Sequence, residues 1–122
     1  MSSAAPLPQQ PLQQLAVRDL AAWVAEHSAR QPVLLDVRED WELATARLDL
    51  PGARLVHIPM RALPARLAEL DAAQPVLALC HHGMRSLQCV TFLRHQGHAQ
   101  AYNIAGGIDA WSREVDARVP LY

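Results

Sequence analysis

The sequence predicts a single α/β domain with a mostly parallel central sheet and helices on both faces. Continuous apolar runs recur along the chain, which is typical of strands that are buried on both faces of a sheet. Stretches with apolar residues at helical spacing lie between these runs, and strands that alternate with helices favour a parallel sheet. The chain has 122 residues, of which 51% are hydrophobic, so one core can form without disulfides or metal ions.

The expected domain begins after an N-terminal tail. Residues 1–14 are mostly small, polar or proline residues, and we expect them to form a flexible segment. The remaining residues, 15–122, are expected to form the domain. No internal repeat and no second domain boundary is found within them.

Helices are expected in four places. Apolar side chains recur at helical spacing from about 18 to 28 and again around 60 to 70. A third amphipathic stretch covers residues 86–96 and is followed by Gly97, a typical C-terminal cap. Trp111 lies in an expected terminal helix, where we interpret it as a core anchor.

Four strands are expected from the apolar runs, at residues 33–37, 54–58, 75–80 and 101–104. Arg38 directly follows the first of them. We expect it to pair with Asp36 or a neighbouring acid and to stabilise the edge of the sheet, since ion pairs commonly serve structure. The alternative is that Arg38 contributes positive potential near the site.

Charge and hydropathy exclude several classes of protein. Eleven arginines and no lysine stand against twelve acidic residues, and the two signs are interspersed. This pattern provides neither a basic stripe for nucleic acid nor a polybasic membrane patch. The apolar runs are far shorter than the roughly 20 residues that span a bilayer, and no secretory signal is recognised. A cytoplasmic protein without nucleic-acid or membrane partners is expected.

The two cysteines, Cys80 and Cys89, are expected to be free thiols. On one helix they would lie more than two turns apart, at about 1.5 Å per residue, which is too far for a disulfide. Cys89 falls among apolar residues of the predicted 86–96 helix, so burial is its expected role.

Cys80 opens the loop with the most distinctive chemistry, Cys80-His81-His82-Gly83-Met84-Arg85-Ser86. Gly83 stands where the backbone must bend sharply, and such a loop turns successive N–H groups inward. Those amides, the positive end of the following helix and Arg85 all favour a thiolate over a thiol. Most unpaired cysteines only fill a core, but this combination predicts a reactive nucleophile at Cys80.

Over residues 15–122 the sequence resembles a single-domain rhodanese, a sulfurtransferase. The resemblance rests on short segments in matching order and spacing: Leu34-Leu35-Asp36-Val37-Arg38-Glu39, Pro51-Gly52-Ala53, His57-Ile58-Pro59, the loop from Cys80 to Ser86, and Gly106-Gly107-Ile108-Asp109-Ala110-Trp111.

The resemblance implies a two-step sulfur transfer. The Cys80 thiolate takes the outer sulfur of a donor such as thiosulfate and holds it as a persulfide, and cyanide or a thiol then accepts it. The expected substrate-binding residues are the rest of the loop: His81, His82, Gly83, Met84, Arg85 and Ser86. No cofactor is expected, and a sulfur-accepting protein is a further candidate partner.

Two other functions are weighed against this one. A cysteine phosphatase or arsenate reductase is suggested by Cys80, Arg85 and Ser86, which echo a phosphate-binding loop. Four residues separate Cys80 from Arg85, whereas the phosphatase pattern has five, and the smaller loop fits sulfur better than a phosphoryl group. The second alternative, a partner-dependent persulfide carrier or a noncatalytic sensing module, is left open by the sequence.

A metal site is considered and not expected. The potential ligands are Cys80, His81, His82, His95 and His98, but adjacent loop residues do not easily converge on one tetrahedral ion. His95 and His98 are interpreted as solvated residues near a helix end. His81 and His82 stand where many thiosulfate-using rhodaneses have a strong cation, and a histidine is only partly charged near neutral pH, so the physiological donor is left open.

Overall fold

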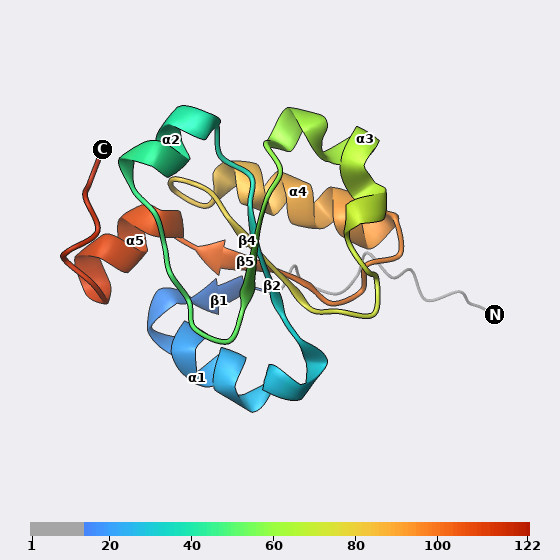
Figure 1. Cartoon of the computed structure of the whole chain (residues 1–122), viewed down its shortest axis with the longest axis horizontal. Helices are drawn as coiled ribbons and strands as arrows, with labels where there is room; N and C mark the ends of the chain where they lie inside the picture. Colours follow the sequence, from blue (N-terminus) through green and yellow to red (C-terminus); the bar gives the residue numbers. More distant parts are fainter. Residues whose placement is uncertain (1–13) are drawn as a thin grey trace.

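The computed structural model describes residues 14–122, which form a five-stranded sheet with helices on both faces (Figure 1). The strands are β1 (Gln14–Ala16), β2 (Val33–Asp36), β3 (Arg54–His57), β4 (Val76–Leu79) and β5 (Ala101–Ala105). Their order across the sheet is β1-β5-β4-β2-β3, and every neighbouring pair is parallel. The predicted α/β class is confirmed, and the described sheet is parallel throughout.

Strand β1 is an element that the sequence analysis did not predict. It has three residues, of which only Leu15 is partly buried, so it lacks an apolar run. It is defined instead by its pairing with β5, in which Gln14 lies opposite Asn103. Gln14 was expected to end the N-terminal tail, and the other residues of that expected tail, 1–13, lie outside the described part of the chain.

The helices include short 3-10 turns, labelled η. Their bounds are η2 (Val17–Asp19), α1 (Leu20–Glu26), η3 (Ser28–Arg30), α2 (Asp40–Thr45), η4 (Met60–Ala62), α3 (Leu63–Arg66), η5 (Leu67–Glu69), α4 (Met84–His95) and α5 (Gly107–Glu114). The helix expected around 60 to 70 is thus divided into three short pieces, and Pro64 in the first turn of α3 has no N–H to donate. Gly97 caps α4 as expected, with φ of +97°.

The core consists of two layers that the sheet separates. Alternate residues of a strand point to opposite faces, so Leu34 packs against α1 and α5 while Leu35 packs against α3 and α4. Trp111 of α5 belongs to the first layer, which confirms its expected role as a core anchor. In Figure 1, α3 and α4 lie on one side of the sheet and α1 on the other.

The carboxyl ends of the parallel strands meet at one edge of the sheet, at the left in Figure 1. The segments that follow β2, β4 and β5 therefore converge there, together with the C-terminal residues of the chain. In open parallel sheets this edge is where ligands bind, because loop amides and helix starts meet there.

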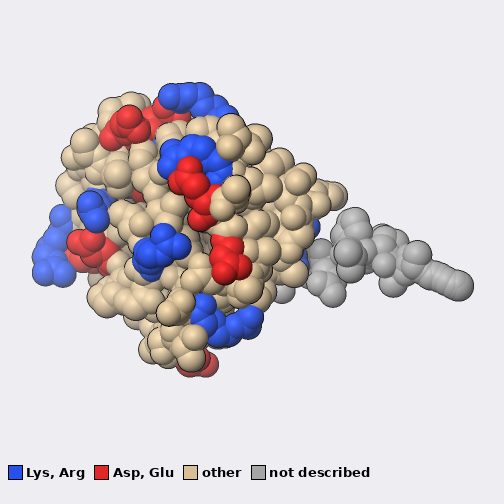
Figure 2. All heavy atoms as spheres, turned by 45° about the vertical axis from the view of Figure 1, so that its right-hand side comes forward, with Lys and Arg blue, Asp and Glu red and all other residues tan. Residues whose placement is uncertain are grey.

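The charged side chains are mixed by sign. On the face shown in Figure 2, arginines and acidic residues alternate and no large area of one sign forms. Several are joined in exposed pairs, such as Arg66 with Glu69 and Arg118 with Asp116. Within residues 14–122 no helix combines the length and the apolar character needed to cross a membrane.

Candidate functional site

Cys80 is the first residue after β4, at the carboxyl edge of the sheet. It is 1% exposed, and its Sγ accepts a hydrogen bond of 3.0 Å from the N–H of Gly83. The Ser86 hydroxyl oxygen lies 3.2 Å from the same sulfur. Two of the predicted site residues, Gly83 and Ser86, are therefore in direct contact with the predicted nucleophile.

Two glycines set the shape of the loop. Gly83 has φ of +97°, a conformation that residues with a side chain rarely adopt. Gly107 has φ of +64°, and a Cβ there would lie 2.4 Å from the carbonyl oxygens of both Cys80 and His81. The loop and the start of α5 are thus packed backbone against backbone, which only glycine permits at position 107.

The start of α5 also fixes the direction of the peptide groups in the loop. The Ile108 N–H donates to the Cys80 carbonyl at 2.9 Å, and the Asp109 N–H donates to the His81 carbonyl at 3.0 Å. In a trans peptide the carbonyl and the next N–H point in opposite directions. The N–H groups of His81 and His82 therefore point away from α5, so the loop gathers its amides on its other side.

Asn103 of β5 orients the Ser86 hydroxyl. The Asn103 Nδ2 donates to the Gly83 carbonyl at 3.2 Å and to Gln14 Oε1 at 2.9 Å, which turns its Oδ1 toward Ser86 Oγ at 2.5 Å. The hydroxyl has one proton and two acceptors within reach, Asn103 Oδ1 and Cys80 Sγ. When Ser86 donates its proton to Asn103 Oδ1, the Ser86 oxygen can accept a hydrogen bond from the S–H of a Cys80 thiol. When Cys80 is a thiolate, Ser86 must instead donate its proton to the sulfur.

Arg85 binds Glu42 of α2. Its Nη1 and Nη2 donate to the two carboxylate oxygens at 2.7 and 2.8 Å, and the Glu42 side chain is only 4% exposed. The hydrogen bonds from Arg85 lower the pKa of Glu42 to about 2, and the same bonds raise the pKa of Arg85. The Glu42 carboxylate therefore compensates much of the positive charge of Arg85, which the sequence analysis expected to favour the Cys80 thiolate.

Glu42 accepts two further hydrogen bonds. The Glu39 N–H donates to Oε1 at 3.0 Å in the capping box of α2. The Tyr122 hydroxyl donates to Oε2 at 2.8 Å and itself accepts a hydrogen bond of 3.0 Å from Arg38 Nη1. Burial first, and the Glu42 carboxylate with it, raise the pKa of Tyr122 to about 12.

Arg38 has the structural role that the sequence analysis expected. It is fully buried, and its Nε and Nη2 donate to the Asp36 carboxylate at 3.0 and 2.7 Å. Its Nη2 also donates to the Ala46 carbonyl at 2.8 Å. Arg38 therefore joins the end of β2 to the segment that follows α2.

His81 and His82 belong to a row of stacked rings beside the loop. His81 stacks on Tyr122 and on His82, with ring centroids 3.9 Å apart in each case. Trp41 of α2 meets the Tyr122 ring edge-on at 5.8 Å. We call these four side chains the aromatic row. Burial lowers the pKa of His81, so its neutral form is favoured at neutral pH.

Three potential metal ligands lie close together beside the loop. His81, His82 and Asp109 each offer a ligand atom, and these atoms lie within 4.8 Å of one another. The two rings are stacked, however, whereas an ion binds in the plane of an imidazole, so the rings would have to turn to share one. His98 was expected to be solvated but is buried, whereas His95 is exposed as expected.

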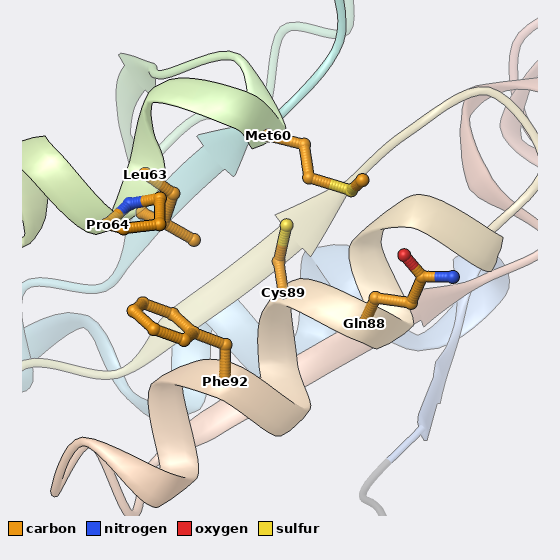
Figure 3. Close-up of a pocket in the computed structure, with 6 residues that line it drawn as sticks. All are labelled: Met60, Leu63, Pro64, Gln88, Cys89 and Phe92. Carbon is orange, nitrogen blue, oxygen red and sulfur yellow. The ribbon is translucent and has the colours of Figure 1, made fainter.

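Cys89 is separate from the loop. Its sulfur points from α4 toward Met60 and Leu63 at the base of an apolar pocket of about 190 Å³ (Figure 3). Burial raises the pKa of its thiol to about 12, which keeps it protonated at neutral pH. Both cysteines are free, so the expected burial of Cys89 and the expected lack of a disulfide agree with the structure.

Comparison with known proteins gives the family. Residues 20–114 match the rhodanese-like domain family. A protein named sulfurtransferase from Allochromatium vinosum is 35% identical over 81 residues, which cover 66% of this chain and 72% of that protein. The chloroplastic rhodanese-like/PpiC domain-containing protein 12 of Arabidopsis thaliana is 38% identical over 93 residues, 73% of this chain but 30% of that longer protein.

Solved structures of rhodanese-like proteins have the same fold as this chain. The rhodanese-related protein of Thermoplasma volcanium has a TM-score of 0.69 and 27% identity, and the match covers 90% of this chain and 99% of that one. The rhodanese-like domain protein of Staphylococcus aureus has a TM-score of 0.70 and 27% identity, covering 91% and 99%. The fold and the cysteine loop define a small α/β domain that carries a thiol, Cys80, at the carboxyl edge of its parallel sheet. The chain belongs to the rhodanese-like sulfurtransferase family.

Three residues near the site were not singled out from the sequence: Glu42, Asn103 and Tyr122. A signal existed for Glu42, because Glu39 and Glu42 have the spacing of a capping box. Asn103 is a polar residue within an apolar strand, which is a weaker signal. Nothing in the sequence around Tyr122 indicates that its ring stacks on His81.

Proposed function

We propose that this protein is a sulfurtransferase that moves a sulfane sulfur from a donor to a thiophilic acceptor through a persulfide on Cys80. The observation that carries the proposal is the position of the Cys80 sulfur, at a strand-to-helix turn with the Gly83 N–H and the Ser86 hydroxyl directed at it. Membership of the family supports it. Thiosulfate is the simplest donor, and cyanide or a small thiol is the simplest acceptor.

The proposed reaction has two balanced steps. The Cys80 thiolate attacks the outer sulfur of thiosulfate, and the S–S bond of thiosulfate breaks with its electron pair on the departing sulfite. Cys80 then carries a persulfide anion. Cyanide attacks the outer sulfur of the persulfide, thiocyanate leaves, and the Cys80 thiolate is restored. This is covalent catalysis with ping-pong kinetics.

The loop supplies fixed dipoles for the anionic intermediate. We expect the inner sulfur to keep the Gly83 N–H, and the outer sulfur to lie on the side of the loop where the amides gather. The Ser86 proton turns to the sulfur whenever Cys80 is anionic, and Asn103 accepts it otherwise. The role of His81, His82, Met84 and Arg85 in binding substrate is part of the same proposal.

A persulfide carrier that passes sulfur to a partner protein is the second candidate. The observation that favours it is the exposure of His82 and Met84 on either side of Gly83, which lets a large acceptor approach the loop. Efficient transfer to cyanide or a small thiol without any partner would favour the enzyme over the carrier.

The phosphatase alternative has less support. Arg85 is engaged by Glu42 rather than turned to a phosphoryl site, and only four residues lie between Cys80 and Arg85. Phosphate release from an aryl phosphate at a rate that depends on Cys80 would reverse this preference.

We further propose that the protein acts in the cytoplasm. Both cysteines are free, and Cys80 must be reduced to attack a donor. A reducing compartment maintains that state. Recovery of the protein mainly from an oxidising compartment would contradict the proposal.

Mass spectrometry tests the function directly. Folded protein treated with thiosulfate or an organic persulfide should gain one sulfur atom on Cys80, and a reductant should remove it. Cys80→Ser should form no adduct and show no turnover, whereas Cys89→Ser should retain most of both. If folded protein gains no sulfur on Cys80 from any donor, the proposed function is wrong.

A further inference from the structure

The charges around the Cys80 loop are already paired. Arg85 gives two hydrogen bonds to Glu42, and Arg113 donates to Asp109 at 2.9 Å. His81 lies between two rings, and burial lowers its pKa. Within residues 14–122, the loop therefore offers no arginine without a carboxylate partner. A dianion such as thiosulfate gains little attraction there.

Exposed apolar surface lies at the same place. Met84 is 68% exposed and follows Gly83, whose N–H contacts the Cys80 sulfur. Trp41 is 62% exposed and closes the outer end of the aromatic row, which reaches back to His81 beside Cys80. In Figure 1, α2, α5 and the C-terminal residues all lie at this end of the sheet.

We propose that this surface selects sulfur donors that carry an apolar group next to the sulfane sulfur and a single negative charge, the class of organic persulfides and thiosulfonates. The inference rests on the proposed function and names its substrate class. Met84 and the aromatic row contact the apolar group of the donor, while the sulfane sulfur reaches Cys80. Met84 is the specificity-determining residue of the loop.

The chemistry of such a donor balances in the same way as that of thiosulfate. The Cys80 thiolate attacks the terminal sulfur of a thiosulfonate anion. The bond between the two sulfur atoms breaks with its electron pair on the sulfonyl group, which departs as a sulfinate. One negative charge enters with the donor and one leaves with the sulfinate. The persulfide formed on Cys80 is the same.

Benzenethiosulfonate and thiosulfate are a matched pair of probes, because the first replaces one charged oxygen of the second with a phenyl ring. With cyanide as the common acceptor, kcat/KM for each donor reports the first half-reaction alone in a ping-pong mechanism. The ratio of the two values measures donor selection. Comparing that ratio between variants cancels the intrinsic reactivity of the donors.

Met84→Arg should lower the ratio of kcat/KM for benzenethiosulfonate to that for thiosulfate by about tenfold, since it removes apolar contact and adds a free cation. Met84→Ser should lower kcat/KM for benzenethiosulfonate by about threefold and that for thiosulfate by less, so the ratio should also fall. Val115→Arg is the matched control, because Val115 is an exposed apolar residue at the far end of α5. It should leave the ratio unchanged.

A ratio that is the same in Met84→Arg as in the wild type, or that shifts equally in Val115→Arg, overturns this inference. The two proposals fail in different ways. If neither donor adds a sulfur to Cys80 in the mass spectrum, the sulfurtransferase proposal itself fails. If both donors add it and Met84 does not affect the ratio, only the assignment of the donor class fails.

Discussion

Glu42 and Arg85 are 43 residues apart in the sequence and share two hydrogen bonds of 2.7 and 2.8 Å. The pair joins α2 to the first turn of α4, where the Cys80 loop ends. The Tyr122 hydroxyl donates a further hydrogen bond to the same carboxylate. The C-terminal end of the loop is therefore held in place by Glu42, a residue of another helix.

The Glu42 pair should make the protein sensitive to acid. The pKa of Glu42 falls from 4.5 to about 2 on folding, so its contribution to stability is complete above about pH 4.5 and disappears as the pH falls toward 2. Glu42→Gln should therefore lower the free energy of unfolding at pH 7 by roughly 3 kcal/mol. The difference from the wild type should shrink below pH 4.

Urea unfolding at a series of pH values measures this effect. Glu69→Gln is the control, because Glu69 forms an exposed pair with Arg66 and exposed pairs add little stability. Equal stability of the wild type and Glu42→Gln at pH 7 would contradict the assigned role of the pair.

Gly107→Ala should disrupt the loop. The new Cβ would lie 2.4 Å from the Cys80 and His81 carbonyl oxygens, so the start of α5 must move away and the two hydrogen bonds to these carbonyls weaken. We expect a loss of about 2–4 kcal/mol in stability and a large loss of sulfur transfer. Gly97 also has a positive φ, of +97°, but there is no atom within 4 Å of the new Cβ in Gly97→Ala. It should cost less stability and should leave activity near that of the wild type.

Ser86 and Asn103 should change the reactivity of Cys80 in opposite directions. Ser86→Ala removes the hydroxyl 3.2 Å from the sulfur, so alkylation of Cys80 by iodoacetamide at pH 7 should slow by about fivefold. Asn103→Ala removes the competing acceptor and lets the Ser86 proton stay on the sulfur, so alkylation should become faster. Thr91→Ala removes another hydroxyl from α4, one that binds the Leu87 carbonyl, and should have no effect. If both site variants shift the rate in the same direction, the proton assignment is wrong.

Cys89 should remain inert in the folded protein. Burial raises the pKa of its thiol to about 12, so at pH 8 almost none of it is thiolate, the reactive form. In the Cys80→Ser variant, iodoacetamide at pH 8 should add nothing to the native protein and one group after unfolding in urea. Modification of Cys89 in native protein at the rate of a small-molecule thiol would show that the site is open.

The sequence predicted the elements whose signal is local. Strands β2 and β4 are buried on both faces and read as continuous apolar runs, and α4 has both an amphipathic pattern and a glycine cap. Strand β1 escaped prediction because its identity comes from pairing with β5, some 90 residues away. Helix α2 was not predicted, because it has six residues, too few for a periodic pattern, and its capping box is its one local signal.

The site also divides into residues that the sequence reveals locally and residues that only the fold brings together. The Cys80 loop was found because its residues are consecutive and their chemistry is visible together. The partners of that loop come from other elements, brought close by the parallel sheet: Glu42 from α2, Asn103 from β5 and Tyr122 from the C-terminal residues. The ion pair of Arg85 was not predicted for this reason, since the positive charge is evident from the sequence but the Glu42 partner is not.

The hydrogen bonds from Ile108 and Asp109 to the Cys80 and His81 carbonyls have a consequence for the order of folding. During synthesis Cys80 leaves the ribosome before α5, the helix that holds the Cys80 loop in shape, and chains generally begin to fold from the N-terminal side. Strand β1 also cannot pair until late, because its partner β5 ends at Ala105. The thiol therefore acquires its reactive setting only after the start of α5 has been synthesised, so a chain that stops before α5 carries the nucleophile without the means to use it.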